Sequence, residues 1–133
     1  MKTNETEQRV YYHDTDHGGV VYYSNYLKWF EIGRTEILRE AGLNYADFEK
    51  KGLIAPVVEV KCNYKGPALY DDIIIIKTKI ESIGNSSIKF CYEIINKKTG
   101  NILAEGYTVN VFVNRKTMKS AKIPEELRKA LQD

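Results

Sequence analysis

Two aspartates lie close together near the start of the chain, in a segment with two glycines that ends where a helix is expected to begin. Asp14 and Asp16 belong to Tyr11–Tyr26, whose sequence is YYHDTDHGGVVYYSNY. A carboxylate can attack an activated carbonyl carbon or take a proton from water. Unpaired N–H groups at a helix N-terminus can stabilise negative charge on an oxygen. Residues 11–26 therefore contain the components of an acyl-transfer site.

The composition of the 133 residues predicts one domain spanning residues 1–133. Twenty Lys and Arg against 18 Asp and Glu give a net charge of +2, and the charges are scattered, so nucleic acid is not expected as a partner. The longest apolar run, Ile73–Ile76, is far shorter than the roughly 20 residues of a transmembrane segment. The polar start Met1–Arg9 has no signal-peptide core, which indicates a cytoplasmic protein.

The chain has two cysteines, Cys62 and Cys91, and both lie inside apolar strand patterns. Neither has a CxxC partner or a nearby histidine, so we expect reduced, packed thiols. His13 has no further ligands at a recognisable spacing, and we expect no metal and no cofactor.

A helix is predicted from about Tyr23 to Ala41, ended by Gly42 in a C-cap position. At 100° per residue, its apolar side chains gather on one face, formed by Tyr26, Leu27, Phe30, Gly33, Ile37, Leu38 and Ala41. Arg34 falls within this face, one turn after Glu31, and a partly buried salt bridge between them is expected. A role of this pair in positioning the active site is the alternative.

Strand patterns occupy most of the remaining chain. A short strand is predicted at Arg9–Tyr12, a half-buried strand of period two at Val58–Tyr64, and three longer ones at Ile73–Ile83, Ser87–Ile95 and Ile102–Val113. Pro124–Leu131 reads as a short helix. The fold class is therefore α+β, with one antiparallel sheet and one substantial helix to cover it. Long edge strands favour pairing with a second copy.

The motif at Tyr11–Tyr26, running into Leu27–Arg34, closely resembles the hotdog-fold acyl-CoA thioesterases of the 4-hydroxybenzoyl-CoA thioesterase and YbgC type. The resemblance spans nearly the whole chain, and Tyr70–Asp72 resembles the turn before the third strand of that family. It implies a hotdog fold, in which an antiparallel sheet wraps around one long helix. It also implies an acyl-CoA substrate and a homo-oligomer, either a dimer or a tetramer.

In that family the second aspartate of the motif is catalytic, which corresponds to Asp16, and a backbone N–H at the position of Tyr23 polarises the thioester carbonyl. Asp16 as nucleophile and Asp16 as general base both remain open. Asp14 is expected to shape the turn by bonding nearby N–H groups. The chain departs from the YbgC pattern at Tyr23, where many members have His, and at His13, where Glu is common.

The expected substrate-binding residues lie in the motif, at the helix start and after the last long strand. They are His17, Gly19, Val20, Tyr26 and Lys119. Lys119 is expected to hold a coenzyme A phosphate as part of a basic cluster with Arg115, Lys116 and Lys122, and a solvated basic turn is the alternative. A hydratase is disfavoured because no histidine follows His17. The main alternative is a non-catalytic module that binds acyl-CoA or an acyl carrier protein.

Overall fold

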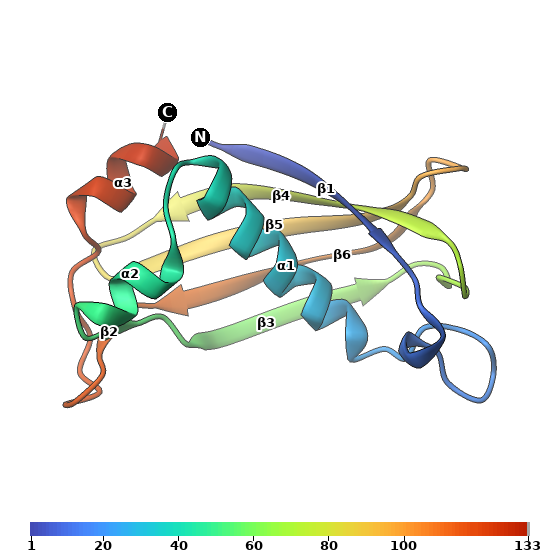
Figure 1. Cartoon of the computed structure of the whole chain (residues 1–133), viewed down its shortest axis with the longest axis horizontal. Coiled ribbons are helices and arrows are strands. Elements are labelled where there is room, and N and C mark those ends of the chain that lie inside the picture. The colour runs from blue at the N-terminus through green and yellow to red at the C-terminus, as the bar shows by residue number, and fades with distance from the viewer. Residues whose placement is uncertain (133) are drawn as a thin grey trace.

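A five-stranded antiparallel sheet with one long helix across its face forms the centre of the computed structural model, which describes residues 1–132 (Figure 1). The sheet strands are β1 (Thr3–Arg9), β3 (Val57–Tyr64), β4 (Ile73–Ile83), β5 (Ser87–Asn96) and β6 (Ile102–Val111). Their order is β1-β4-β5-β6-β3. The helices are α1 (Asn25–Glu40), α2 (Tyr45–Lys50) and α3 (Glu125–Gln132), and the 3-10 turn η1 covers Tyr12–Asp14.

Helix α1 begins two residues later than predicted and ends one residue earlier. Ala41 is its C-cap, and Gly42 takes the positive φ of 82° that a C-terminal cap favours. The predicted buried face is largely confirmed, because Tyr26, Phe30, Gly33, Ile37 and Leu38 are buried. Two positions differ from the prediction, since Leu27 is 39% exposed and the buried Trp29 was missed.

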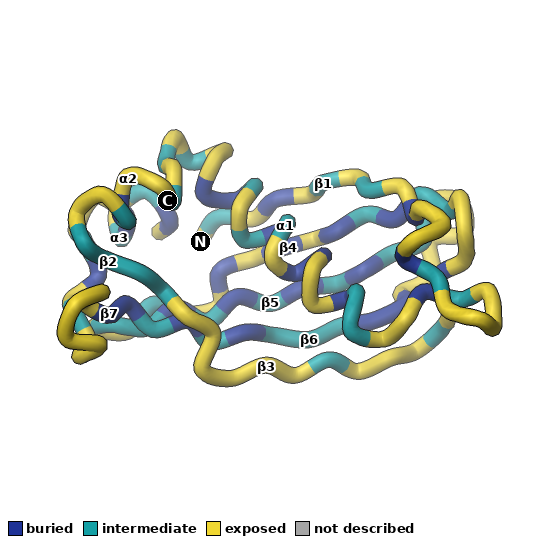
Figure 2. The backbone as a smooth tube through the Cα atoms, turned by 60° about the horizontal axis from the view of Figure 1, so that its bottom comes forward, coloured by how far each residue is buried: buried dark blue, intermediate teal, exposed yellow. Residues whose placement is uncertain are grey.

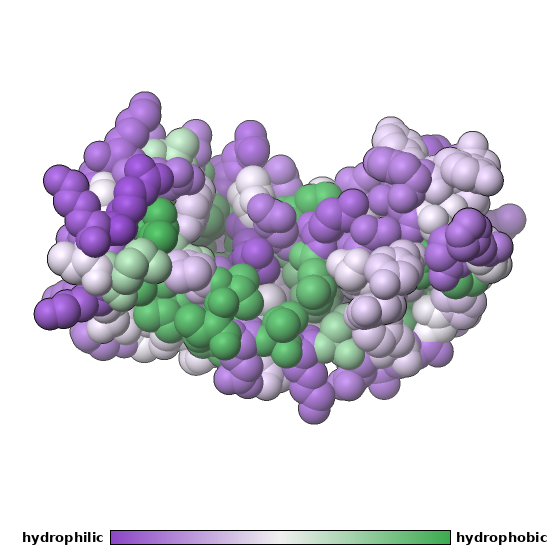
Figure 3. Space-filling model, turned by 90° about the horizontal axis from the view of Figure 1, so that it is seen from below, coloured by the Kyte–Doolittle hydropathy of each residue, from purple (hydrophilic) through white to green (hydrophobic). Residues whose placement is uncertain are grey.

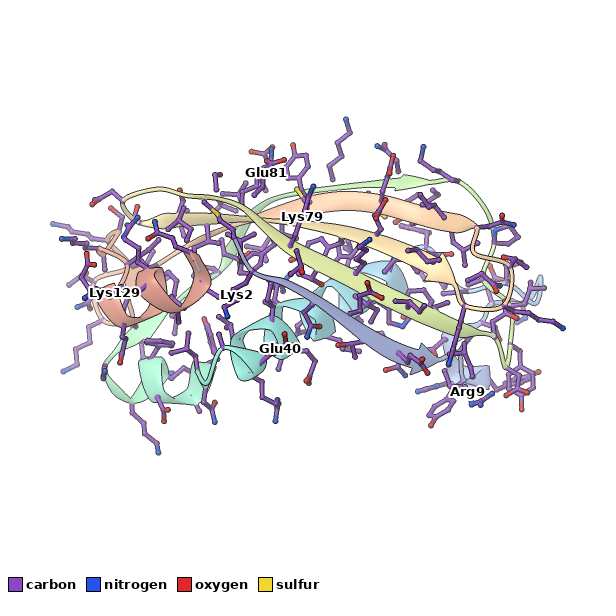
Figure 4. The ribbon with its side chains drawn as sticks, turned by 90° about the horizontal axis from the view of Figure 1, so that it is seen from above. Lys2, Arg9, Glu40, Lys79, Glu81 and Lys129 are labelled. Carbon is purple, nitrogen blue, oxygen red and sulfur yellow. The ribbon has the colours of Figure 1, made fainter. Side chains whose placement is uncertain are left out.

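The core lies between α1 and the sheet. Phe30 stacks on Tyr92 with ring centroids 4.2 Å apart, and a Cβ on Gly33 would overlap the Thr78 hydroxyl oxygen, so the helix approaches β4 closely. On the other face of the sheet, Lys79 and Glu81 point away from α1 (Figure 4). One side of the sheet is thus apolar and covered, and the other is charged.

The predicted pair of Arg34 and Glu31 does not form among residues 1–132. Arg34 Nη1 instead donates to the Tyr92 hydroxyl at 3.2 Å, while Glu31 is exposed. The i, i+3 spacing permitted the ion pair, but Arg34 turns toward the sheet and Glu31 toward solvent. This expectation of a buried salt bridge is therefore wrong.

The first strand also differs from the prediction. It covers Thr3–Arg9 and pairs with β4, from Thr3 opposite Lys79 to Arg9 opposite Ile73, whereas Tyr12–Asp14 is a 3-10 turn. The sequence TNETEQR contains no apolar residue and so shows no apolar alternation, and Asn4 is the one buried residue of the strand. Strand β1 is held by its backbone ladder, which side-chain periodicity does not reveal.

Strand β3 forms the opposite edge of the sheet and is exposed along nearly its whole length (Figure 2). Val58, Val60 and Tyr64 are 59%, 44% and 47% exposed, so the predicted half-burial is not observed in a single chain. Seen from the β3 side, apolar side chains form a band across the surface (Figure 3). The alternation in the sequence therefore marks the face of β3 toward α1, most of which stays exposed in a single chain.

The two ends of the sheet carry different structures (Figure 1). At one end lies the loop before α1, and at the other lie α2, α3 and a small ribbon of β2 (Leu53–Ile54) and β7 (Val113–Asn114). The helix α3 is close to the predicted Pro124–Leu131, whereas α2 was not predicted. Within residues 1–132, no helix has the length and apolarity needed to cross a membrane.

Candidate active site

The loop between η1 and α1 is a tight hairpin with Asp16 near its tip. Thr15 and Val21 form an antiparallel bridge, the Asp16 N–H donates to the Val20 carbonyl at 2.8 Å, and the Gly19 N–H donates to the Asp16 carbonyl at 3.1 Å. Gly19 has a φ of +80°, which favours glycine. The turn thus places Asp16 in a defined backbone position beside the helix start.

Asp14 is buried and ties this loop to its surroundings. Its carboxylate accepts the Tyr11 N–H at 2.9 Å, and its carbonyl accepts the Tyr22 N–H at 3.0 Å and the Asn25 side-chain amide at 2.7 Å. The structure therefore confirms the prediction that Asp14 bonds nearby N–H groups. These contacts connect η1, the loop and the first residue of α1.

Asp16, by contrast, is exposed, and one of its two carboxylate oxygens accepts a hydrogen bond within residues 1–132. Its Oδ1 accepts the Gly18 N–H at 2.8 Å, and its Oδ2 has no partner among residues 1–132. The pKa of the Tyr22 hydroxyl is raised, first by the Tyr23 hydroxyl and in smaller part by the Asp16 carboxylate. Asp16 thus offers one free carboxylate oxygen next to the aromatic residues that precede α1.

The start of α1 leaves two N–H groups available. Within residues 1–132, neither the Tyr23 nor the Ser24 N–H has an acceptor. Ser24 is the N-cap but makes no side-chain cap, and the first turn contains no acidic residue. Within residues 1–132, neither a side-chain cap nor an acid in the first turn offsets the positive end of the helix, and a developing oxyanion would be stabilised there.

Tyr64, at the end of β3, holds the helix start in place. Its hydroxyl donates to the Tyr23 carbonyl at 2.8 Å, and its ring packs edge-on against Tyr26 at 5.1 Å and Tyr23 at 6.4 Å between centroids. Burial is the main cause that raises the pKa of Tyr64 to about 12, so the hydroxyl keeps its proton at neutral pH. The sheet edge thereby fixes the peptide between Tyr23 and Ser24.

The other predicted binding residues of the motif are near Asp16 in different ways. His17 and Gly19 are exposed at the hairpin tip, and Val20 forms a bridge with Leu69 from the segment before β4. Tyr26 is only 3% exposed and lies beneath Tyr64, where burial raises its pKa. His17, Gly19 and Val20 thus surround Asp16, and Tyr26 supports the layer below.

Lys119 is not brought to Asp16 within one chain. It is exposed in the turn after β7, where its carbonyl accepts the Asn114 N–H at 2.9 Å. This turn lies at the end of the sheet opposite the hairpin (Figure 1). A single chain therefore separates the predicted phosphate contact from the predicted catalytic residue.

Two contributors to the site were missed in the sequence. Tyr64 was assigned to a strand but not to the helix start, and Ala68, whose carbonyl accepts the Val21 N–H at 2.9 Å, was not assigned at all. Tyr64 and Tyr23 are 41 positions apart. The alternation of β3 could have indicated that Tyr64 faces α1, but no local signal indicates its partner.

Comparisons with known proteins agree with this architecture. A model of the thioesterase-like superfamily matches residues 10–131. The acyl-CoA thioester hydrolase YbgC of Escherichia coli is 34% identical over 119 residues, which cover 90% of this chain and 88% of that protein. The solved DHNA-CoA thioesterase from Staphylococcus aureus has a TM-score of 0.94 and 32% identity, over 99% of this chain and 90% of that one. A 1,4-dihydroxy-2-naphthoyl-CoA thioesterase from Synechocystis has a TM-score of 0.94 and 25% identity, over 99% and 97%.

Proposed function

This chain belongs to the thioesterase-like superfamily, and we propose that it hydrolyses the thioester of a small acyl- or aryl-CoA to the free acid and coenzyme A. Its similarity to named acyl-CoA thioesterases identifies it as an enzyme of this class. Its antiparallel sheet and single long helix confirm the hotdog fold that the resemblance predicted. The aryl-CoA named for the Synechocystis relative supports a ring among the acyl groups accepted.

The observation that carries the mechanism is that the Asp16 Oδ2, in the loop before α1, and the Tyr23 and Ser24 N–H groups at the start of α1 have no partner among residues 1–132. In the proposal, the thioester carbonyl oxygen accepts the Tyr23 N–H, which withdraws electron density from the carbonyl carbon. A thiolate is a good leaving group, so one carboxylate and one oxyanion site are sufficient without a Ser-His-Asp set.

Asp16 then acts in one of two ways. As a nucleophile, its oxygen bonds to the carbonyl carbon, the C–S bond breaks, and water hydrolyses the mixed anhydride to restore the carboxylate. As a general base, it takes a proton from the water that attacks the carbonyl carbon, and the proton passes to the departing thiolate. Both routes use the same oxygen and yield the same products.

We also propose that the protein works as a homo-oligomer built on β3. The free edge of β3 has exposed apolar residues, whereas the other edge of the sheet, β1, is polar. Two β3 strands that pair antiparallel would extend the sheet and cover the band in Figure 3. Such pairing also turns the Lys119 end of one chain toward the Asp16 end of the other, which supports Lys119 as a coenzyme A phosphate contact.

We propose that the protein is located in the cytoplasm. Cys62 and Cys91 are both free thiols, as expected in a compartment that keeps cysteines reduced. Burial raises the pKa of each, so neither is suited to act as a thiolate nucleophile.

Replacing Asp16 tests the proposal directly. Asp16→Asn removes the charge but keeps the shape, and we expect kcat to fall on the order of 10² or more while the melting temperature stays that of the parent. Asp14→Asn is the matched control, because Asp14 is buried and bonds backbone N–H groups. It should lower thermal stability more than kcat. An Asp16→Asn enzyme with parental kcat would remove Asp16 from the mechanism.

A further inference from the structure

A pocket of about 310 Å³ lies beyond the second turn of α1, away from the Asp16 hairpin. Its walls are mainly apolar, and they include Leu38, Val57, Ile88, Phe90 and Phe112. This volume is at the small end of the range for ligand pockets, roughly 300–1,000 Å³. The pocket is therefore of a size for a small acyl group or a ring.

Arg34 brings a cation into this apolar pocket, and among residues 1–132 it has no anionic partner. The residue is half-buried, and its one side-chain hydrogen bond among residues 1–132 goes from Nη1 to the Tyr92 hydroxyl. Burial is the main cause that raises the pKa of Tyr92 to about 12, so this partner is neutral. A guanidinium has several further N–H donors in a planar fork. These donors are available to an oxygen of a ligand.

Four more polar residues line the same pocket, namely Glu31, Thr35, Tyr45 and Asn110. The Tyr45 hydroxyl accepts the Ala55 N–H, and the Asn110 side-chain nitrogen donates to the Ala55 carbonyl at 2.9 Å. The Asn110 Oδ1 is buried without a partner among residues 1–132. Glu31 is at an exposed position of the lining. The lining thus combines unused donors with unused acceptors, as a site for a polar substituent requires.

Resting on the proposed function, we propose that this pocket receives the acyl group of the substrate, and that Arg34 is the residue that selects acyl groups with an oxygen acceptor at their far end. A ring hydroxyl and a carboxylate share this chemistry, because both accept from a guanidinium. The apolar walls hold the body of the acyl group.

In the proposed dimer, the pocket that receives the acyl group of a thioester bound at Asp16 belongs to the partner chain. Within one chain, Arg34 lies about 14 Å along α1 from Asn25, at a rise of about 1.5 Å per residue, and Asp16 lies before the helix. Antiparallel pairing of two β3 strands places the Tyr64 end of one beside the Val57 end of the other. Tyr64 bonds Tyr23 beside the Asp16 hairpin, and Val57 lines the pocket. The thioester bound at Asp16 would therefore extend its acyl group into the pocket of the partner.

Matched acyl-CoA pairs test the selectivity. We compare kcat/KM for 4-hydroxybenzoyl-CoA against benzoyl-CoA, and for glutaryl-CoA against valeryl-CoA. Arg34→Met, which keeps the length of the side chain, should lower kcat/KM about tenfold or more for whichever oxygenated substrates the parent prefers, since a lost hydrogen bond to a charged group has this magnitude. The unsubstituted substrates should change less than about threefold.

Two variants control for effects on folding. Arg34→Lys keeps the charge and should retain part of the preference, whereas Arg39→Met changes an exposed arginine of the same helix and should leave it intact. If Arg34→Met reduces kcat/KM equally for all substrates, or for none, the selectivity role is wrong.

Calorimetric binding of the same acyl-CoAs to Asp16→Asn, with and without Arg34→Met, separates the proposed selectivity from the proposed function. An Arg34-dependent preference in binding without turnover in the parent would overturn only the proposed function.

Mixed dimers test the origin of the pocket. Asp16→Asn and Arg34→Met chains, unfolded and refolded together in equal amounts, form mixed dimers in about half of the molecules. If the pocket belongs to the partner, each mixed dimer has one intact site, and activity on the preferred oxygenated substrate should reach about a quarter of the parent. A mixture whose activity equals the mean of its two components would overturn the shared site.

Discussion

At the scale of single residues, the Tyr64 hydroxyl is the contact through which the sheet reaches the proposed oxyanion site. It donates to the Tyr23 carbonyl, and the N–H of the same residue, which has no acceptor among residues 1–132, is the donor that the proposed mechanism uses. A hydrogen bond to the carbonyl restrains the backbone of this residue and so the direction of its N–H. Tyr64 is thus a positioning residue in the proposed mechanism.

Tyr64→Phe keeps the ring against Tyr26 and removes only this donor. We expect kcat to fall about three- to tenfold with KM changed less than twofold, because a typical hydrogen bond contributes about 0.5–1.5 kcal/mol and this one acts on the transition state. Tyr70→Phe is the control, since Tyr70 is exposed and packs edge-on against Tyr12 at the same end of the molecule. Parental steady-state kinetics for Tyr64→Phe would show that the contact is structural only.

At the scale of elements, the close approach of α1 to β4 depends on Gly33. Glycine is normally unfavourable inside a helix by about 1 kcal/mol relative to alanine, yet here a Cβ would overlap the Thr78 hydroxyl. The packing at this point therefore outweighs helix propensity. It also sets the depth at which α1 lies on the sheet, and so the position of its N-terminus.

Gly33→Ala should lower stability by about 1–3 kcal/mol in spite of its better helix propensity, because overpacking strains the core. Thermal melts measure the change. Thr78→Ala removes the obstructing hydroxyl, so the double variant should be more stable than Gly33→Ala alone, a coupling that a double-mutant cycle quantifies. If Gly33→Ala raised the melting temperature, the helix would have room to move.

The elements differ in how far the sequence determines them. Helix α1 was predictable because apolar residues recur at helical spacing and Gly42 ends it, and both signals are local. Strand β1 was not, because its side chains are polar and its pairing with β4 is a long-range backbone contact. The same limit applies to the site. Asp16 and Tyr23 lie in one short motif and remain predictions from a resemblance, whereas the contact of Tyr64 with Tyr23 became visible only in the fold.

At the scale of the whole molecule, the face of β3 toward α1 is the most apolar exposed strand surface. Val58 and Val60 lie on this face with Tyr64, while Lys61 and Asn63 line the charged outer face with Lys79. A strand with an apolar face and unpaired backbone groups is suited to self-pairing. The proposed dimer and the proposed shared pocket both depend on this strand.

Val60→Lys should convert the dimer to a monomer at micromolar concentration and reduce kcat/KM more than tenfold, because a charge within the paired face is costly to bury. Light scattering and kinetics report the two effects. Asn63→Lys places the same charge on the outer face of β3 and should change neither. A monomeric Val60→Lys protein with full activity would exclude a shared site.

The two edges of the sheet are chemically unequal, and this asymmetry limits how far strands can add. Once two copies join at β3, both remaining edges are β1, on which Glu7 pairs with Lys97 and Arg9 with Asp71, at 2.7 and 2.8 Å. A further strand would have to displace water from these charges, so addition stops after one step. Although β3 pairs with a second copy, the charged β1 edges therefore prevent further strand addition and fibril formation.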